Sequence, residues 1–123
     1  MEKLLAERVN IAEKFRLIDQ YWSPKIVGEL NGQLVKLAKF KGEFVWHQHD
    51  NEDELFLVIK GNLTIKLENR EITLTEGDFT VIPRGTKHLP VASEEVQVLM
   101  FEPKSTVNTG DVRNELTAES KWI

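Results

Sequence analysis

The sequence predicts an all-β domain, a sandwich or barrel, preceded by one amphipathic helix. From Lys25 onward, short apolar segments alternate with turn residues and divide the chain into about eight strands, which is the pattern of an all-β sandwich or barrel. Asn31-Gly32 stands between two of these segments, and both residues tolerate the positive φ of a tight hairpin. Before Lys25 the apolar residues instead recur at the spacing of a helix, so the chain divides into two unlike parts.

The predicted helix covers residues 2–19. Apolar side chains recur there at steps of three or four, with charged residues between them, which is the period of an amphipathic helix. They are Leu5, Val9, Ala12, Phe15 and Ile18. Because proline disfavours helical geometry in the residue before it, we expect the helix to end near Ser23-Pro24. Its polar face mixes both signs of charge, so we expect it to pack on the outside of the domain, and we assign residues 1–24 to it.

Two of the predicted strands are apolar on both faces. In residues 54–59, and again in residues 96–101, apolar side chains occupy positions of both parities. This is expected when one face fills a barrel and the other meets a second layer or another subunit. A homodimer is therefore expected, and the N-terminal helix is the alternative cover for the same surface. We assign residues 25–103 to the β-barrel and residues 104–123 to a polar C-terminal tail, whose Trp122 docks on the barrel.

Composition limits the kinds of partner and cofactor. With 123 residues and 41% hydrophobic side chains, the chain suits one globular domain. Its 16 basic and 20 acidic side chains give a net charge of −4, which repels polyanions and argues against nucleic-acid binding. No apolar stretch resembles a signal peptide or a membrane span, so a cytoplasmic protein is expected. Since cysteine is absent, any metal must be bound through nitrogen and oxygen.

The three histidines and one glutamate form a candidate metal site. His47 and His49 are two residues apart, so in a strand both rings lie on the same face and can bind one ion. Glu54 shares its face with the inward side chains of the next strand, where an unpaired carboxylate is costly to bury. Asp53 has the opposite parity and a loop position, so we favour Glu54 as the ligand. His88 follows a turn set by proline and glycine and completes the candidate set.

Two sequence motifs resemble those of the cupin superfamily. The first, over residues 42–61, consists of a glycine, H-x-H, a glutamate and a second glycine. These positions are Gly42, His47, His49, Glu54 and Gly61. The second, over residues 77–88, consists of a glycine, P-x-G and a histidine. These positions are Gly77, Pro83, Gly85 and His88. There are two departures: four residues rather than the usual five separate Gly42 from His47, and Ala92 stands where the second motif often ends in asparagine. Neither departure changes a metal position.

The resemblance implies a small single-domain cupin, of cupin type 2 and similar to the mannose-6-phosphate isomerase-like group. The implied fold is the cupin double-stranded β-helix, a jelly-roll barrel. The implied cofactor is one divalent transition metal, Fe, Mn, Zn, Ni or Co, bound by His47, His49, Glu54 and His88. An octahedral ion held by these four ligands keeps about two positions open, which is what a small-molecule ligand or substrate requires.

Three functions fit such a site. The first is a metal-dependent dioxygenase-type oxidoreductase acting on a small organic molecule. The second is a metal-dependent isomerase or epimerase of a sugar or sugar phosphate, in which the ion acts as a Lewis acid. The third is a non-enzymatic module that binds a metal or a small ligand. The expected lining of the site is apolar and favours a small organic or aromatic substrate over a phosphosugar. That lining comprises Val45, Phe56, Val58 and either Phe79 or Met100. We interpret Arg84 and Lys87, beside His88, as solvated loop charges rather than as an anion site.

Overall fold

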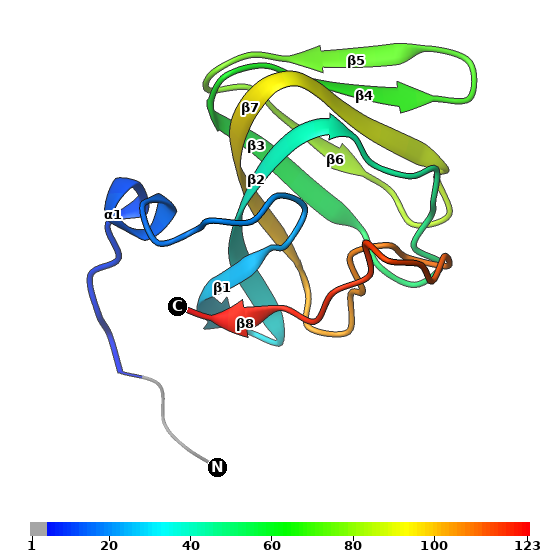
Figure 1. The fold of residues 1–123 in the computed structure, drawn as a ribbon. Helices are drawn as coiled ribbons and strands as arrows, with labels where there is room; N and C mark the ends of the chain where they lie inside the picture. Colours follow the sequence, from blue (N-terminus) through cyan, green and yellow to red (C-terminus); the bar gives the residue numbers. More distant parts are fainter. Residues whose placement is uncertain (1–4) are drawn as a thin grey trace.

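The computed structural model describes residues 5–123 (Figure 1). Within that range the chain forms one short helix and eight strands. The helix is α1 (Ile11–Phe15), and the strands are β1 (Lys25–Leu30), β2 (Gln33–Glu43), β3 (Glu54–Lys60), β4 (Leu63–Leu67), β5 (Glu71–Leu74), β6 (Phe79–Ile82), β7 (His88–Pro103) and β8 (Lys121–Trp122). The predicted β-rich body that begins at Lys25 is therefore confirmed.

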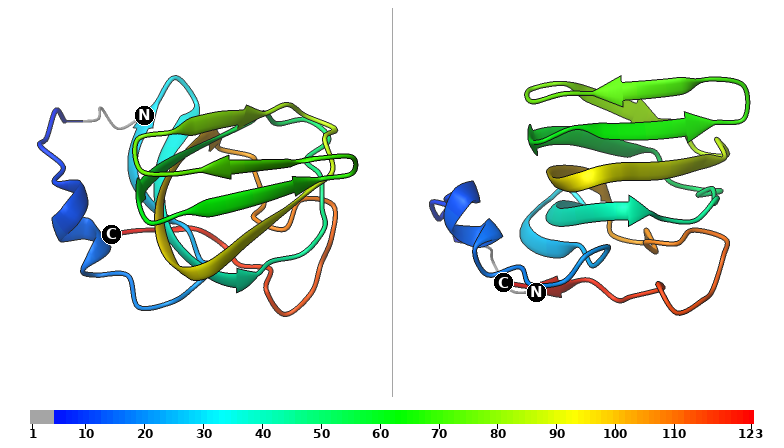
Figure 2. Two further views of the ribbon diagram at one scale, coloured as in Figure 1. Left: turned by 90° about the horizontal axis from the view of Figure 1, so that it is seen from above. Right: turned by 45° about the horizontal axis from the view of Figure 1, so that its top comes forward.

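Strand β7 connects most of the barrel. It is 16 residues long, and it pairs antiparallel with β4 over residues 88–91, with β3 over residues 97–101 and with β2 between Val91 and Pro103. The sheet runs in the order β5-β4-β7-β2-β1-β8, while β3 pairs with both β6 and β7. The strands curve around a common interior, as the two views of Figure 2 show. This arrangement is the jelly-roll barrel that the sequence predicts.

The Asn31-Gly32 turn joins β1 and β2 as predicted. Both residues have positive φ, 50° for Asn31 and 77° for Gly32, and Leu30 lies opposite Gln33 in the ladder. Two consecutive residues of positive φ give the hairpin turn whose twist matches that of the flanking strands. The turn therefore fixes the register of β2, the strand that leads into the histidine segment.

Apolar side chains form two clusters on opposite sides of the sheet. The larger one fills the barrel with inward residues of β2, β3, β4 and β7, together with Trp22. The smaller one lies outside the barrel, where Phe15 and Ile18 of the N-terminal segment pack with Val27 and Leu37. The expectation that the N-terminal segment packs on the outside of the domain is thus confirmed.

The predicted helix over residues 2–19 is wrong in its extent. Helix α1 has only five residues and begins after Asn10, whose side chain accepts a hydrogen bond of 2.9 Å from the Glu13 amide. Leu5 and Val9 before it are 78% and 40% exposed, so their apolar face has no surface to pack on, and helices without packing are marginal at this length. Residues 2–4 of the prediction lie outside the described part. No helix among residues 5–123 is long and apolar enough to cross a membrane.

The C-terminal tail returns to the barrel as an added strand. Strand β8 pairs in parallel with β1, with Ile26 opposite Trp122, and the Ile123 amide donates to the Ile26 carbonyl over 3.1 Å. Trp122 therefore docks through its backbone, while its side chain stays 54% exposed. On its way from β7 to β8 the tail passes the open end of the barrel, next to the segment that follows β2 (Figure 1).

Candidate metal centre

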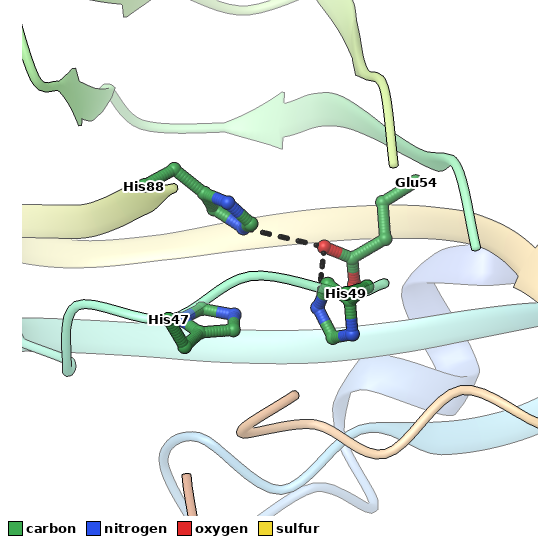
Figure 3. A group of neighbouring side chains, drawn as sticks. All are labelled: His47, His49, Glu54 and His88. Atoms are coloured by element: carbon green, nitrogen blue, oxygen red, sulfur yellow. Dashed lines mark ion pairs between the residues drawn. The ribbon is translucent and has the colours of Figure 1, made fainter. Parts of the chain in front are cut away.

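Four side chains from three segments of the chain meet inside the barrel (Figure 3). Glu54 opens β3 and His88 opens β7, while His47 and His49 lie in the segment between β2 and β3. All four are buried, with exposed fractions of 4% or less. One possible ligand atom from each residue lies within 4.8 Å of the others. The structure thus brings together the complete set of predicted ligands.

Backbone hydrogen bonds connect the segments that carry the three histidines. The His47 amide donates to the His88 carbonyl over 3.1 Å, and the His88 amide donates to the His47 carbonyl over 2.9 Å. The Gly85 amide donates to the His49 carbonyl over 2.8 Å. His47 forms only this isolated bridge, so the predicted regular strand through His47 and His49 is wrong. The bridge between His47 and His88, in place of a regular strand, holds this segment so that the rings point into the barrel.

The rings of His47 and His88 are oriented in the same way. Nδ1 of His47 lies 2.8 Å from the Val45 carbonyl, and Nδ1 of His88 lies 2.8 Å from the Thr86 carbonyl. Since a carbonyl can only accept, Nδ1 of each ring must carry the proton and donate it. The lone pair of each neutral ring is then on Nε2, where a metal can bind, and such bonds are typical of metal-ligating histidines.

Several buried polar atoms at the centre have no hydrogen-bond partner. They are both ring nitrogens of His49, Nε2 of His88 and Oε1 of Glu54. Glu54 Oε1 is 3.0 Å from His49 Nε2 and 3.4 Å from His88 Nε2 (Figure 3), but the groups are not aligned as hydrogen bonds. Unsatisfied buried polar atoms are costly, and a cation among them would remove that cost. Imidazole and carboxylate donors suit divalent transition metals, so the cluster can hold a metal ion.

Burial and neighbouring charges tune these groups in different directions. Burial, and next the electrostatic effect of the neighbouring His88 side chain, lower the pKa of His47 to about 4, which keeps its ring neutral near pH 7. Burial also opposes charge on His49, but the neighbouring Glu54 carboxylate outweighs it and raises the pKa of His49. Burial alone would raise the pKa of Glu54, yet the His49 and His88 rings hold it well below its usual range. Glu54 is therefore an anion in the absence of a metal.

A second buried ionic pair lies beside Glu54 and was missed in the sequence analysis. Lys36 Nζ is 2.9 Å from Glu102 Oε1, with both side chains at least 97% buried. Burial and the neighbouring Glu54 carboxylate raise the pKa of Glu102 well above its usual range, while Lys36 opposes that rise. Strand parity could have revealed the pair, because each residue lies two positions from an inward apolar residue of its own strand and therefore faces inward too: Lys36 from Ala38, and Glu102 from Met100.

The competing carboxylate, Asp53, lies outside the cluster. Its side chain is 49% exposed and accepts hydrogen bonds from Arg84, one of 2.8 Å from the backbone amide and others from the guanidinium group. Arg84 is itself 63% exposed, which agrees with its interpretation as a solvated loop charge. Glu54 is buried with Phe56 and Val58 on the inward face of β3, so strand parity predicted which of the two carboxylates faces the interior.

A small cavity adjoins His47 and Glu54. Its volume is about 20 Å³, roughly enough for one or two water molecules. Most of its lining is apolar. The other lining residues are Trp22, Pro24, Phe40, Phe44, Phe56, Pro90, Met100 and Asn108. Of the predicted lining, Phe56 and Met100 are confirmed. Phe79 is wrong, because it lies opposite Leu57 on the outward face of the sheet and is 62% exposed.

A more open cavity of about 200 Å³ reaches the cluster at His49. It lies between residues 50–52 and the C-terminal tail, and its lining is polar and acidic. The lining residues other than His49 are Asp50, Asn51, Glu52, Ser105, Val107, Gly110 and Asp111. The tail therefore forms part of the approach to the cluster, which the sequence patterns did not indicate.

The family follows from a direct match. The family model described as the cupin domain matches residues 33–102, more than half of the chain. The chain belongs to the cupin family. The matched region contains all four residues of the buried cluster, and its β-rich fold is the one that the two sequence motifs imply.

Similar proteins agree with this family. A solved cupin-2 domain protein from Shewanella frigidimarina is 44% identical, with a TM-score of 0.77, over 78% of this cupin and 94% of that chain. The uncharacterized protein YdbB of Bacillus subtilis is 37% identical over 89 residues, or 72% of this cupin and 73% of YdbB. A protein of Saccharolobus solfataricus named "Putative dioxygenase" is 31% identical over 71 residues, which cover 58% of this cupin and 18% of that longer protein.

Proposed function

We propose that this cupin binds one divalent transition metal through His47, His49, Glu54 and His88 and acts as a dioxygenase-type oxidoreductase on a small organic molecule. The observation that carries the proposal is the convergence of buried, unpartnered nitrogen and oxygen atoms on one point. Iron is the metal that we propose for this reaction. When bound by these four residues, iron would supply the redox chemistry that lets dioxygen react with an organic substrate.

The protein's own residues prepare this site before any ligand arrives. The carbonyl groups of Val45 and Thr86 fix the ring orientation of His47 and His88. The buried Glu54 carboxylate contributes one negative charge, which partly balances a divalent ion. Because three neutral imidazoles add no charge, the assembled site keeps a net positive charge that attracts anionic or polarisable ligands.

The cavity beside the cluster supports a small and mainly apolar substrate. Phe40, Phe44, Phe56 and Met100 line it, and such side chains exclude water and favour organic groups. Its polar lining residue, Asn108, already uses its amide group to bond the backbone at Trp22, Leu116 and Ala118. These bonds hold the Asn108 amide in place, and we expect recognition to depend mainly on shape and apolar contact.

One similar protein supports the oxygenase reading over the alternatives. The Saccharolobus solfataricus protein carries the word dioxygenase in its name, and its similarity to this cupin lies above 30% identity. That support concerns the matched region, since this cupin covers only 18% of that protein. The substrate of this cupin is therefore proposed from its own cavity and not from the similar protein.

The metal site is tested first, by elemental analysis of the purified protein and by titration with Co²⁺. We expect one ion per chain in the wild type and a large loss of affinity in Glu54→Gln. The matched control is Asp53→Asn, which removes the adjacent carboxylate outside the cluster and should bind as the wild type does. Equal binding by both variants would refute the assignment of Glu54 as a ligand.

The reaction class is tested separately, by oxygen consumption after anaerobic loading with Fe²⁺. The probes are simple phenols and catechols, chosen for the mainly apolar lining of the cavity, and the control is protein loaded with Zn²⁺. Oxygen uptake that requires both Fe²⁺ and the probe supports the proposal. A protein that binds metal and consumes no oxygen with any probe favours the isomerase or binding-module alternatives instead.

We further propose that the cupin forms a homodimer through the outer face of β3 and β6. Leu55 lies opposite Val81 and Leu57 opposite Phe79 in the ladder, and the two β6 residues are 48% and 62% exposed. The N-terminal segment packs farther along β3, against Ile59, and so leaves this apolar patch free among the described residues. Patches of this kind commonly mark protein interfaces.

The dimer is tested by light scattering coupled to size-exclusion chromatography. We expect Phe79→Glu to shift the protein from dimer to monomer. Trp122→Glu, which changes another exposed aromatic residue on β8 (54% exposed), is the control and should remain dimeric. A monomeric wild type would refute the proposal directly.

A further inference from the structure

The C-terminal tail contacts the backbone between two of the candidate ligands. Gln48 separates His47 from His49, and its amide donates to Asp111 Oδ1 over 3.0 Å. In return, the Asp111 amide donates to the Gln48 carbonyl over 3.0 Å. Both backbone groups of Gln48 are thus held by one residue of the tail. Because His47 and His49 share the peptide groups of Gln48, this contact limits how both rings can move.

Gly110 lies so close to this segment that a side chain at position 110 would clash with it. Its φ is +57°, and a Cβ atom placed on it would lie 2.2 Å from the Gln48 carbonyl oxygen and 3.1 Å from Cδ2 of the His47 ring. The first distance is far below van der Waals contact. A side chain at Gly110 would therefore displace the tail or push the Gln48 peptide and the His47 ring out of position.

The turn that presents Gly110 and Asp111 is itself fixed by buried hydrogen bonds. Thr109 is completely buried, and its hydroxyl group bonds the Val112 carbonyl and the Thr117 hydroxyl. The Asn108 side chain bonds three backbone groups of other segments. The tail is also attached just before this turn, where the Ser105 hydroxyl donates to Glu52 over 2.7 Å. The segment over residues 105–111 is therefore a rigid support and not a loosely placed loop.

We propose that the turn over residues 108–111 is a structural part of the metal centre, in which Gly110 and Asp111 are positioning residues for His47 and His49. This inference rests on the proposed metal site. The ring of His47 is held on one side by the Val45 carbonyl and on the other by the approach of Gly110. The turn completes the site from outside the region that the cupin-domain match covers, residues 33–102.

The inference is tested with two variants and two matched controls. Gly110→Ala introduces the Cβ clash, while Gly32→Ala introduces the same left-handed strain at the β1–β2 turn, where no atom lies within 4 Å of the added Cβ. Asp111→Ala removes the acceptor of the Gln48 amide, while Asp111→Asn keeps an oxygen at that place. Each protein is titrated with Co²⁺, whose visible spectrum reports the ligand geometry, and its thermal stability is measured without metal.

We expect Gly110→Ala and Asp111→Ala to weaken Co²⁺ binding by about 10- to 100-fold, the usual effect of losing a residue that supports a metal ligand, and to change the Co²⁺ spectrum. Gly32→Ala should lose thermal stability and keep its Co²⁺ affinity, and Asp111→Asn should recover most of the affinity. Wild-type affinity and spectrum in both Gly110→Ala and Asp111→Ala would overturn the inference.

A measurement without metal separates this inference from the proposed function. In the metal-free protein, the ¹⁵N and ¹H signals of the His47 and His49 rings report their tautomers and surroundings. We expect Gly110→Ala to change both sets of ring signals and Gly32→Ala to leave them unchanged. A wild type that binds no Co²⁺ refutes the proposed function alone, whereas unchanged ring signals in Gly110→Ala refute the positioning role.

Discussion

The buried pair of Lys36 and Glu102 offers a sharp test of how charge is balanced in the barrel. Lys36→Met removes the ammonium group and keeps most of the apolar stem of the side chain. Glu102 then stays buried, with Oε2 already lacking a hydrogen-bond partner and Glu54 as a negative neighbour. The substitution therefore leaves two carboxyl groups near each other without a cation from the protein.

The expected cost follows from the geometry of the pair. At a separation of 2.9 Å, two full charges attract by about 6 kcal/mol if the effective dielectric constant is about 20. Part of that attraction offsets the cost of burying both groups, and breaking a buried pair by removing one partner costs about 3–5 kcal/mol. Proton uptake by Glu102 in the variant favours the lower end of this range. A domain has only about 5–15 kcal/mol of stability in total, so the loss is large.

Urea denaturation of the metal-free protein measures this cost. The control is Lys104→Met, because Lys104 Nζ is 3.5 Å from Glu29 but its side chain is 68% exposed, and exposed pairs contribute about 0–1 kcal/mol. The double variant Lys36→Met/Glu102→Leu should recover most of the stability that Lys36→Met loses. Equal losses in Lys36→Met and Lys104→Met would show that burial does not make the first pair important.

Three further predictions concern pH, metal and backbone geometry. The pKa of His47 is about 4 in the folded protein and about 6.5 in the unfolded chain. Its contribution to the stability of the metal-free protein is therefore fully present above pH 6.5 and falls by about 3 kcal/mol as the pH drops to 4. The raised pKa of His49 acts in the other direction, because the stabilisation from His49 is fully present below pH 6.5 and is lost as the pH rises above that value. Urea curves from pH 4 to 9 should therefore show a maximum near pH 6.5, and a flat profile would contradict both directions. Adding Zn²⁺ at a hundred times its Kd should stabilise the wild type by at most about 2.7 kcal/mol, the value for an ion that does not bind the unfolded chain, with EDTA reversing the shift; an equal shift in Glu54→Gln would argue against this site. Gly61→Ala should cost about 1–3 kcal/mol, since the φ of Gly61 is +98° and its Cβ would lie 3.0 Å from the Glu95 carbonyl; an unchanged urea midpoint would contradict it.

The candidate site could be predicted from sequence because its ligands obey local rules. Strand parity selects Glu54 over Asp53, and the structure buries the first and exposes the second. The same parity rule, applied to charged residues within apolar strands, would also have indicated Lys36 as an inward group. What parity misses is backbone that is not a regular strand. His47 and His49 face the same ion site through a single bridge to β7 and not through a continuous ladder.

The tail and the helix could not be predicted, because long-range packing decides both. Nothing in the polar sequence after Lys104 indicates that Asp111 bonds Gln48, since that contact joins residues 63 positions apart. The apolar period before Ser23 is genuine, and Phe15 and Ile18 do pack against the sheet. The period predicts too long a helix, because it shows which residues are apolar but not whether the fold provides a surface for them to pack on.

Three residues of the candidate metal centre are close together in the sequence, and the fourth, His88, is brought to them by its bridge to His47. His47, His49 and Glu54 lie within one eight-residue stretch, from 47 to 54, so we expect the unfolded chain to bind an ion weakly through them. His88 joins only when β7 pairs with the segment after β2, which requires closure of a long loop. Metal that binds the unfolded chain stabilises the fold less than its affinity suggests. The stabilisation of the fold by metal should therefore come mainly from the affinity that His88 adds. Refolding with metal present from the start should differ in rate from refolding in which metal is added afterwards.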